Sequence, residues 1–293
     1  MSNDLHDYLE RIAVSLEGIL EELKAINKCE RNENKKVNDN ASVLHCYPEV
    51  KTHPKLKQFF EEKGYRIFRI RELENVDSTF VLLANNMGSA YPLVEPLIKE
   101  IKRNLAKGQQ FTLCVREYSA KAITAMCGLA TTLKNHGFLK EYFYKKSPHC
   151  VIVARPENSS KFHDFYTGHW LEYYVANVVR ALVSGRPGAR SINLNAEVRD
   201  RFEEIIEFDV LATLRDEVFW IECKTGEYKK YIEKYEKIAK KLGMGSNHVF
   251  LVIAGIDDAT VKALNESHSI TICNVEGFKT DFENSLNNII DNE

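Results

Sequence analysis

Two apolar, strand-like segments in the last third of the chain restrict its fold more than any other feature. They cover residues 205–214 and 218–224, and only residues 215–217 separate them. Parallel strands need a connection of about a dozen residues or more, whereas antiparallel strands can be joined by a tight turn. We therefore expect the two segments to form an antiparallel hairpin within a sheet.

The segments around this hairpin alternate between helix and strand patterns. A helix is expected at 170–184, where apolar residues recur at helical spacing before a break rich in glycine and proline. A charged helix is expected at 228–242 and a further strand at 248–254. The order helix, strand, strand, helix, strand predicts an α/β domain at 161–293 with at least one crossover connection.

Residues 42–160 form the basic part of the chain, with 18 Lys and Arg residues against 11 Asp and Glu residues. Strands are expected at 65–70, 79–84 and 110–115, helices at 92–107 and 119–135, and a hairpin at 138–145 and 150–154. A helix followed by a hairpin with Lys145 and Lys146 at its tip outlines a winged-helix-like domain. The earlier strands suit a small α/β domain equally well, so both folds stay open.

The N-terminal segment carries a heptad pattern that favours a coiled-coil helix over residues 1–28. Its apolar positions alternate spacings of four and three: Leu5, Leu9, Ile12, Leu16, Ile19, Leu23 and Ile26. Leucine at the a positions with isoleucine at the d positions favours four strands over two. We expect a homo-oligomer through residues 5–26, a tetramer rather than a dimer, while docking of the helix onto its own chain is the alternative. Residues 29–41 are polar and are expected to form a flexible linker.

Composition argues against several classes of protein. The net charge of −2 over 293 residues excludes a uniformly basic nucleic-acid coat, so any nucleic-acid surface must be local. No run approaches the ~18 apolar residues of a membrane span, and the acidic N-terminus is unlike a signal peptide. Seven scattered cysteines without a C-x-x-C pair argue against a disulfide framework. A cytoplasmic protein without a membrane partner is expected.

Charged residues interrupt the two apolar strands in a pattern that indicates a catalytic site. Alternate side chains of a strand share a face, so Glu222 and Lys224 project to one side. The hairpin brings Asp209, thirteen residues before Glu222, to the same patch. Two carboxylates this close repel each other unless a cation lies between them. Unpaired charge among apolar strand residues is costly to bury, which favours a catalytic interpretation.

The cation expected at this patch is Mg²⁺ or Mn²⁺. Hard divalent ions take oxygen ligands, which Asp209, Glu222 and the backbone carbonyl of Cys223 can supply. A bound ion acidifies a coordinated water and neutralises a phosphate, while Lys224 can hold the water or stabilise the developing charge. The pattern therefore predicts metal-assisted hydrolysis of a phosphodiester.

Each of these residues also has a structural interpretation. Asp209 could cap a turn, and Glu222 could form a plain ion pair with Lys224. Glu207 either shares the face of Asp209 or lies at the edge of the sheet, and His169 is expected to pack or cap rather than act as a base. The lysines of the charged helix and of the hairpin tip are either solvated or contact a phosphate backbone.

Three blocks of the C-terminal region resemble the PD-(D/E)xK nuclease superfamily: Thr167–Val175, Glu207–Leu211 and Trp220–Gly226. They are similar to the DUF1887 family, which includes the endonuclease domains of CRISPR ancillary nucleases activated by cyclic oligoadenylate. The resemblance implies a restriction-endonuclease-like mixed sheet with flanking helices. It also implies that Glu172, on the helix before the sheet, completes the metal site. Those nucleases begin with a Rossmann-type cyclic-nucleotide sensor, whereas a heptad helix stands first in this sequence. The nuclease chemistry is therefore carried over, and activation by a cyclic oligonucleotide stays open.

The sequence thus predicts a Mg²⁺- or Mn²⁺-dependent endonuclease with Asp209, Glu222, Lys224 and Glu172 at its centre. DNA is expected as the substrate rather than RNA, positioned by the basic middle region. The alternative is a non-catalytic nucleic-acid-binding or oligomeric adaptor that retains a nuclease fold.

Overall fold

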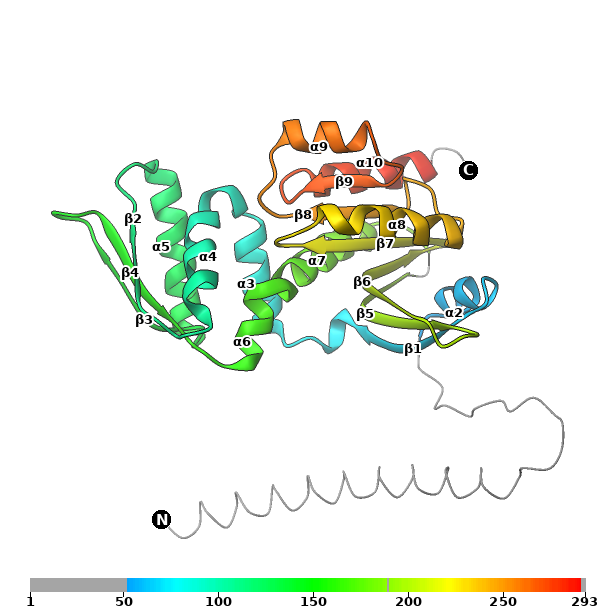
Figure 1. Cartoon of the computed structure of the whole chain (residues 1–293), viewed down its shortest axis with the longest axis horizontal. Coiled ribbons are helices and arrows are strands. Elements are labelled where there is room, and N and C mark those ends of the chain that lie inside the picture. Colours follow the sequence, from blue (N-terminus) through cyan, green and yellow to red (C-terminus); the bar gives the residue numbers. More distant parts are fainter. Residues whose placement is uncertain (1–51, 189, 291–293) are drawn as a thin grey trace, which may run out of the picture. The chain divides into compact units, whose positions relative to one another are not determined.

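The computed structural model of the chain describes residues 52–188 and 190–290 and contains two β-sheets with helices packed against them (Figure 1). The heptad segment at 5–26 and the linker at 29–41 lie outside the described residues, so the coiled coil and the tetramer stay predictions. No helix among the described residues has both the length and the apolar character that crossing a bilayer requires.

The larger sheet is mixed and has six strands in the order β1-β5-β6-β7-β8-β9. They are β1 (Tyr65–Glu72), β5 (Arg190–Asp200), β6 (Ile205–Leu214), β7 (Glu217–Lys224), β8 (Val249–Ile253) and β9 (Thr271–Asn274). Neighbours from β1 to β7 are antiparallel, whereas β7 with β8 and β8 with β9 are parallel. The expected hairpin is confirmed as β6 and β7, and so is an α/β fold with a mixed sheet and flanking helices.

One edge of this sheet comes from the middle region of the sequence. The strand expected at 65–70 is present as β1, and it pairs with β5 rather than with the smaller sheet. Neither β5 nor β9 has a counterpart among the sequence-based expectations. The backbone of β5 needs a partner on each side, and β1 supplies the second one. The larger sheet therefore draws on both 42–160 and 161–293.

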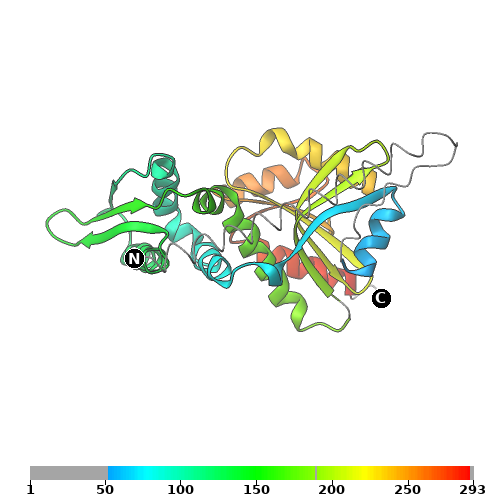
Figure 2. The same ribbon diagram turned by 90° about the horizontal axis from the view of Figure 1, so that it is seen from below.

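Helices cover both faces of the larger sheet. One face shares a core with α2 (Pro54–Glu61), α8 (Lys229–Leu242) and α9 (Asp258–Asn265), and the other packs against α7 (Trp170–Ser184) and α10 (Phe278–Ile290). Figure 2 shows α8 and α9 on the side of the sheet opposite α7 and α10. The helix expected at 228–242 matches α8, which ends at Gly243 with a φ of 67°. Glycine adopts this left-handed conformation without strain.

The smaller sheet is antiparallel, with the strand order β2-β4-β3. It is built from β2 (Phe111–Cys114), β3 (Leu139–Lys145) and β4 (Val151–Pro156), and is accompanied by α3 (Ser78–Gly88), α4 (Tyr91–Leu105) and α5 (Ala120–Asn135). The second expected hairpin is confirmed as β3 and β4, with Lys145 and Lys146 exposed near its tip. Helix α5 leads directly into this hairpin.

The strand expected at 79–84 is wrong, because these residues lie in helix α3. The Asp77 carboxylate caps the helix by accepting a hydrogen bond from the backbone N–H of Thr79 at 2.9 Å. A short apolar run fits either a strand or a buried helix, and here the cap and the buried positions decide for the helix. Those buried positions follow spacings of three, one and three: Phe80, Leu83, Ala84 and Met87.

Short irregular turns precede two of the helices. A 3₁₀ turn, η1 (Leu73–Asn75), lies between β1 and α3. Helix α6 (Ser160–Asp164) runs through a π-helical turn, η2 (Phe165–His169), into α7. A π turn inserts an extra residue and so rotates the side chains that follow it, and such turns are frequent at functional sites.

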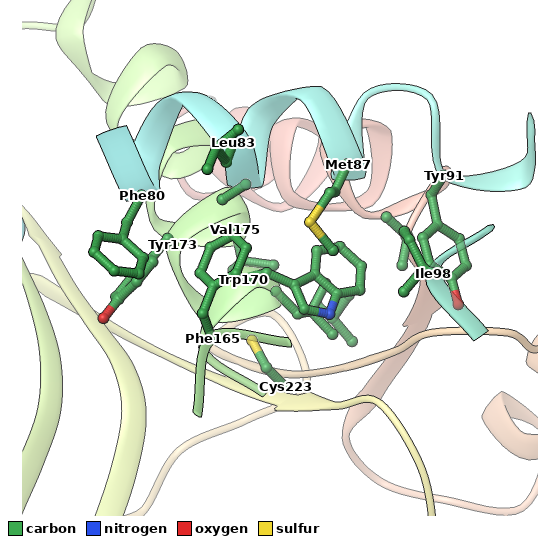
Figure 3. Packing of buried hydrophobic residues seen from close by; sticks show 14 of the residues in the cluster. Phe80, Leu83, Met87, Tyr91, Ile98, Phe165, Trp170, Tyr173, Val175 and Cys223 are labelled. Atoms are coloured by element: carbon green, nitrogen blue, oxygen red, sulfur yellow. The ribbon is translucent and has the colours of Figure 1, made fainter. Parts of the chain in front are cut away.

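Helices α3, α4 and α7 share one hydrophobic core with the larger sheet (Figure 3). The rings of Tyr91 and Trp170 stack with their centroids 5.4 Å apart. Helix α3 lies so close to α7 that a Cβ atom on Gly88 would come within 2.4 Å of the ring of Tyr174. This core fixes the position of α7, the helix that carries Glu172.

Candidate active site

The first feature of the site is the point at which β6 and β7 stop pairing. The last pair in their register is Val210↔Ile221, and the next pair would be Asp209 opposite Glu222. Side chains replace the ladder there: the Asp209 backbone N–H donates to Glu222 Oε1 at 3.2 Å, and the Cys223 N–H donates to Asp209 Oδ2 at 2.8 Å. Both carboxylates are therefore fixed by the backbone of the opposite strand.

Strands β5 and β6 change face at the same level as this break. Leu194 and Val210 belong to the core on the α7 side, whereas Ala196 and Phe208 belong to the core on the α8 side. In a regular strand, side chains two residues apart point to the same face of the sheet. Asn195, between them on β5, has a left-handed φ of 48°. This local distortion brings groups from both faces of the sheet to one place.

The ammonium of Lys224 lies between the two carboxylates. Its Nζ is 3.3 Å from Asp209 Oδ2, 3.4 Å from Glu222 Oε2 and 3.2 Å from the carbonyl oxygen of Cys223. The ring of Tyr235, on α8, lies 5.5 Å from the same nitrogen. The Glu222 side chain is only 4% exposed, whereas those of Asp209 and Lys224 are about one-fifth exposed. The patch predicted from the strand pattern is therefore formed.

Glu172 approaches this patch from helix α7. Its side chain is buried, and its Oε2 accepts a hydrogen bond from Asn195 Nδ2 at 2.9 Å. Burial, and then the negative charge of Asp209, raise the pKa of Glu172 to about 8. A carboxyl group with this pKa is mostly protonated at neutral pH unless a cation comes close.

The pKa of Glu222 is raised for the same reasons. Burial is the larger cause and the charge of Asp209 the next, and together they raise it to about 7. The indole N–H of Trp220 opposes the shift by donating to Glu222 Oε1 at 2.9 Å. Burial lowers the pKa of Lys224, but the charges of Glu222 and Asp209 outweigh it and keep this lysine protonated. The site therefore attracts positive charge.

The atoms that the site offers as ligands are oxygens, the kind that a hard divalent ion prefers. Among the described residues, no three His, Cys, Asp or Glu side chains come close enough together to enclose a metal. Mg²⁺, however, needs only one or two carboxylates and completes its shell with carbonyl oxygen, water and substrate phosphate. Asp209, Glu222 and the Cys223 carbonyl offer that set, and all three now contact the single ammonium of Lys224.

The other residues considered from the sequence lie apart from this set. Glu207 is exposed and stands opposite Glu197 of β5. The ring of His169 packs beside that of Tyr173, with centroids 5.8 Å apart. The position of His169 agrees with the expectation that it packs, whereas Glu207 lies on β6, an inner strand, and not at the edge of the sheet.

Four residues of the site escaped the sequence analysis. Trp220 could have been found, because it alternates with Glu222 and Lys224 along β7. The sequence gives no such signal for Asn195, for Tyr235 or for Lys102 of helix α4. Lys102 donates from Nζ to the carbonyl and hydroxyl oxygens of Thr225, each at 3.1 Å.

Comparison with known proteins gives a fold but no family. No family model matches the chain, and no curated protein matches it. Protein VC1899 from Vibrio cholerae has a similar structure, with a TM-score of 0.50 and 18% identity over 82% of this chain. Can2 from Sulfobacillus thermosulfidooxidans, solved in complex with cyclic tetra-adenylate, also has a TM-score of 0.50, with 17% identity over 79%.

The match spans 64% of the VC1899 chain and 60% of the Can2 chain, so each contains a substantial part with no counterpart here. At this identity the likeness establishes a shared fold and nothing finer. The chain therefore has the α/β fold of these two proteins, and its chemistry must be argued from its own residues.

Proposed function

We propose that this protein is a Mg²⁺- or Mn²⁺-dependent endonuclease that hydrolyses phosphodiester bonds in DNA. The observation that carries the proposal is the convergence of Asp209, Glu222, Lys224 and the Cys223 carbonyl at one break in the β6–β7 ladder. The similarity of three sequence blocks to PD-(D/E)xK nucleases and the fold shared with Can2 support the same conclusion.

In this proposal the carboxylates of Asp209 and Glu222 and the carbonyl of Cys223 hold the ion, and Glu172 completes the set. When bound, the ion neutralises the phosphate and acidifies a coordinated water. With the carboxylates holding such an ion, Lys224 would no longer be held by its contacts with them. Its ammonium can orient the attacking water or stabilise the charge that develops on the phosphate oxygens.

A purely structural ion-pair cluster is the second candidate, because Lys224 already compensates both carboxylates. In that case the protein is a nucleic-acid-binding adaptor that retains the fold. Lys145 and Lys146 at the tip of the β3–β4 hairpin are exposed in either case and are available to a phosphate backbone.

The deciding experiment compares cleavage of plasmid DNA, single-stranded DNA and RNA in Mg²⁺, Mn²⁺ or EDTA. We expect metal-dependent cutting of DNA that falls about 100-fold or more in Asp209→Ala and Lys224→Ala. Glu207→Ala is the matched control, because Glu207 is an exposed carboxylate on the same strand, and it should cut like wild type. Binding without cutting in every metal would instead establish the adaptor.

A further inference from the structure

Helix α4 passes beside the end of β7, where the proposed centre lies. Ile98 and Tyr91 of α4 belong to the core that also contains Trp170 and Cys223, as Figure 3 shows. One helical turn beyond Ile98, the side chain of Lys102 continues in this direction. It reaches Thr225, the residue directly after Lys224.

The contacts of Lys102 are unusual for a lysine because its partners are neutral. Its ammonium donates to the carbonyl and the hydroxyl oxygen of Thr225, and no carboxylate among the described residues lies within ion-pair distance of it. Burial lowers the pKa of Lys102. A partly desolvated cation without a counter-charge is unfavourable, so its placement calls for an anion.

The other two basic residues of α4 behave differently. Lys99 pairs with Glu95 at 3.1 Å, and Arg103 pairs with Glu100, both partners being on the same helix. Helix α4 therefore supplies its own counter-charges on the exposed side. Lys102 is the basic residue of α4 that instead points toward the end of β7.

The partner of Lys102 is held firmly. The hydroxyl of Thr225 donates to the carbonyl oxygen of Thr167, in the π turn that leads into α7. The loop after β7, the turn before α7 and helix α4 thus meet at this hydroxyl. An ammonium has three N–H donors, and Thr225 accepts two of them, which leaves one for a further acceptor.

We propose that Lys102 forms a phosphate subsite next to the cleavage centre. Its ligand is a backbone phosphate of the bound nucleic-acid strand, adjacent to the phosphate that reacts. This inference rests on the proposed function for its ligand, because a nucleic acid is the polyanion that this centre would receive. The subsite binds and positions the strand, and it takes no part in breaking the bond.

Binding measurements test the subsite independently of cleavage. The probe is a fluorescein-labelled 20-base-pair DNA in EDTA, and its Kd is measured by anisotropy over a series of salt concentrations. Lys102→Gln keeps an N–H donor toward Thr225 but removes the charge. We expect about tenfold weaker binding and a salt-dependence slope reduced by about one, which is the signature of one lost phosphate contact.

Lys99→Gln is the matched control, since it removes a lysine from the same helix that already has a carboxylate partner. It should keep the wild-type slope, and Lys102→Arg should keep both the slope and most of the affinity. A merely structural lysine would change the thermal unfolding midpoint of Lys102→Gln and leave the slope intact. A wild-type slope in Lys102→Gln, equal losses in the two Gln variants, or no DNA binding by wild type would each overturn the subsite.

Measurements of cleavage distinguish a failure of the phosphate subsite from a failure of the proposed function. In an active wild type, Lys102→Gln should raise KM about tenfold while kcat changes less than about threefold. If wild type cuts nothing in any metal but Lys102→Gln still reduces the salt slope, the endonuclease proposal fails and the phosphate subsite stands. If wild type cuts and Lys102→Gln is identical to it in KM and slope, the subsite fails alone.

Discussion

At the residue scale, the candidate centre has two carboxylates in contact with one ammonium and a third, buried carboxyl group near them. Lys224 contacts Asp209 and Glu222, and Glu172 lies beside them under the influence of their charge. Burial, and then the charge of Asp209, outweigh the effect of Lys224 and raise the pKa of Glu222 to about 7 and that of Glu172 to about 8. A divalent ion or protons must supply the remaining positive charge.

This imbalance predicts how stability depends on pH. The ordinary pKa of glutamate is about 4.3, so the folded protein keeps protons on Glu222 and Glu172 that the unfolded chain has lost. The contribution of these two groups to the free energy of unfolding is fully present below about pH 4 and is lost as the pH rises through 7 and 8. We expect urea unfolding of the metal-free protein to show a lower free energy at pH 9 than at pH 6.

The variant Glu172→Gln checks the assignment of that effect. It keeps the shape of the side chain and removes its charge, so it should be more stable than wild type at pH 9 in EDTA. Adding Mg²⁺ should stabilise wild type more at pH 9 than at pH 6, because a metal binds the deprotonated ligands. The same pH profile in both proteins would show that Glu172 does not carry the shift.

Asn195 allows a second test at this scale, because it combines a left-handed backbone with a hydrogen bond to Glu172. Asn195→Gly and Asn195→Ala both lose that bond, but only alanine is strained at a φ of 48°. We expect the alanine variant to be less stable than the glycine variant by about 1 kcal/mol in urea unfolding. Equal stabilities would mean that the backbone at this position relaxes freely.

At the scale of elements, prediction succeeded where the pattern was local. The β6–β7 hairpin follows from the short gap between two strand patterns, and α8 follows from helical spacing and a glycine at its end. The error at 79–84 and the unforeseen β5 have a common reason. A short apolar run has no period of its own, and β5 changes face at Asn195, which breaks the alternation that identifies a strand.

The contact between α3 and α7 predicts a stability change at Gly88. A methyl group there would overlap the ring of Tyr174, so Gly88→Ala should destabilise the protein by about 1–3 kcal/mol despite its gain in helix propensity. Gly128→Ala is the control, because a Cβ on this α5 residue meets nothing within 4 Å, and it should stabilise by about 0.5–1 kcal/mol. Thermal and urea unfolding measure both, and equal effects would contradict the close packing of α3 on α7.

At the scale of the whole molecule, the heptads at 5–26 make assembly a separate question from the fold. The six-stranded sheet and its helices, within the described residues 52–188 and 190–290, belong to one compact unit, and the heptads precede that unit in the sequence. Leucine at the a positions and isoleucine at the d positions favour four chains. Assembly is therefore expected to depend on the N-terminal segment and not on the candidate site.

Sedimentation equilibrium tests this expectation. The full-length protein should show four times the 33.7 kDa mass of one chain, and a version lacking residues 1–41 should sediment as a smaller species. The shortened protein should keep its unfolding midpoint, because the deleted residues precede the compact unit. An unchanged mass after the deletion would remove the coiled-coil prediction.

The sequence by itself determined the β6–β7 hairpin, the α/β class and the pairing of Asp209 with Glu222 and Lys224. Strand alternation and the need for a short connection between antiparallel strands are local rules, and they hold whatever surrounds them. Only the tertiary structure decided that β1 completes the sheet and that Lys102 reaches Thr225. Each of these contacts joins residues more than a hundred positions apart in the sequence. The spatial distance between such residues is set by how α4 and α7 pack on the sheet, and no periodic pattern in the sequence predicts it.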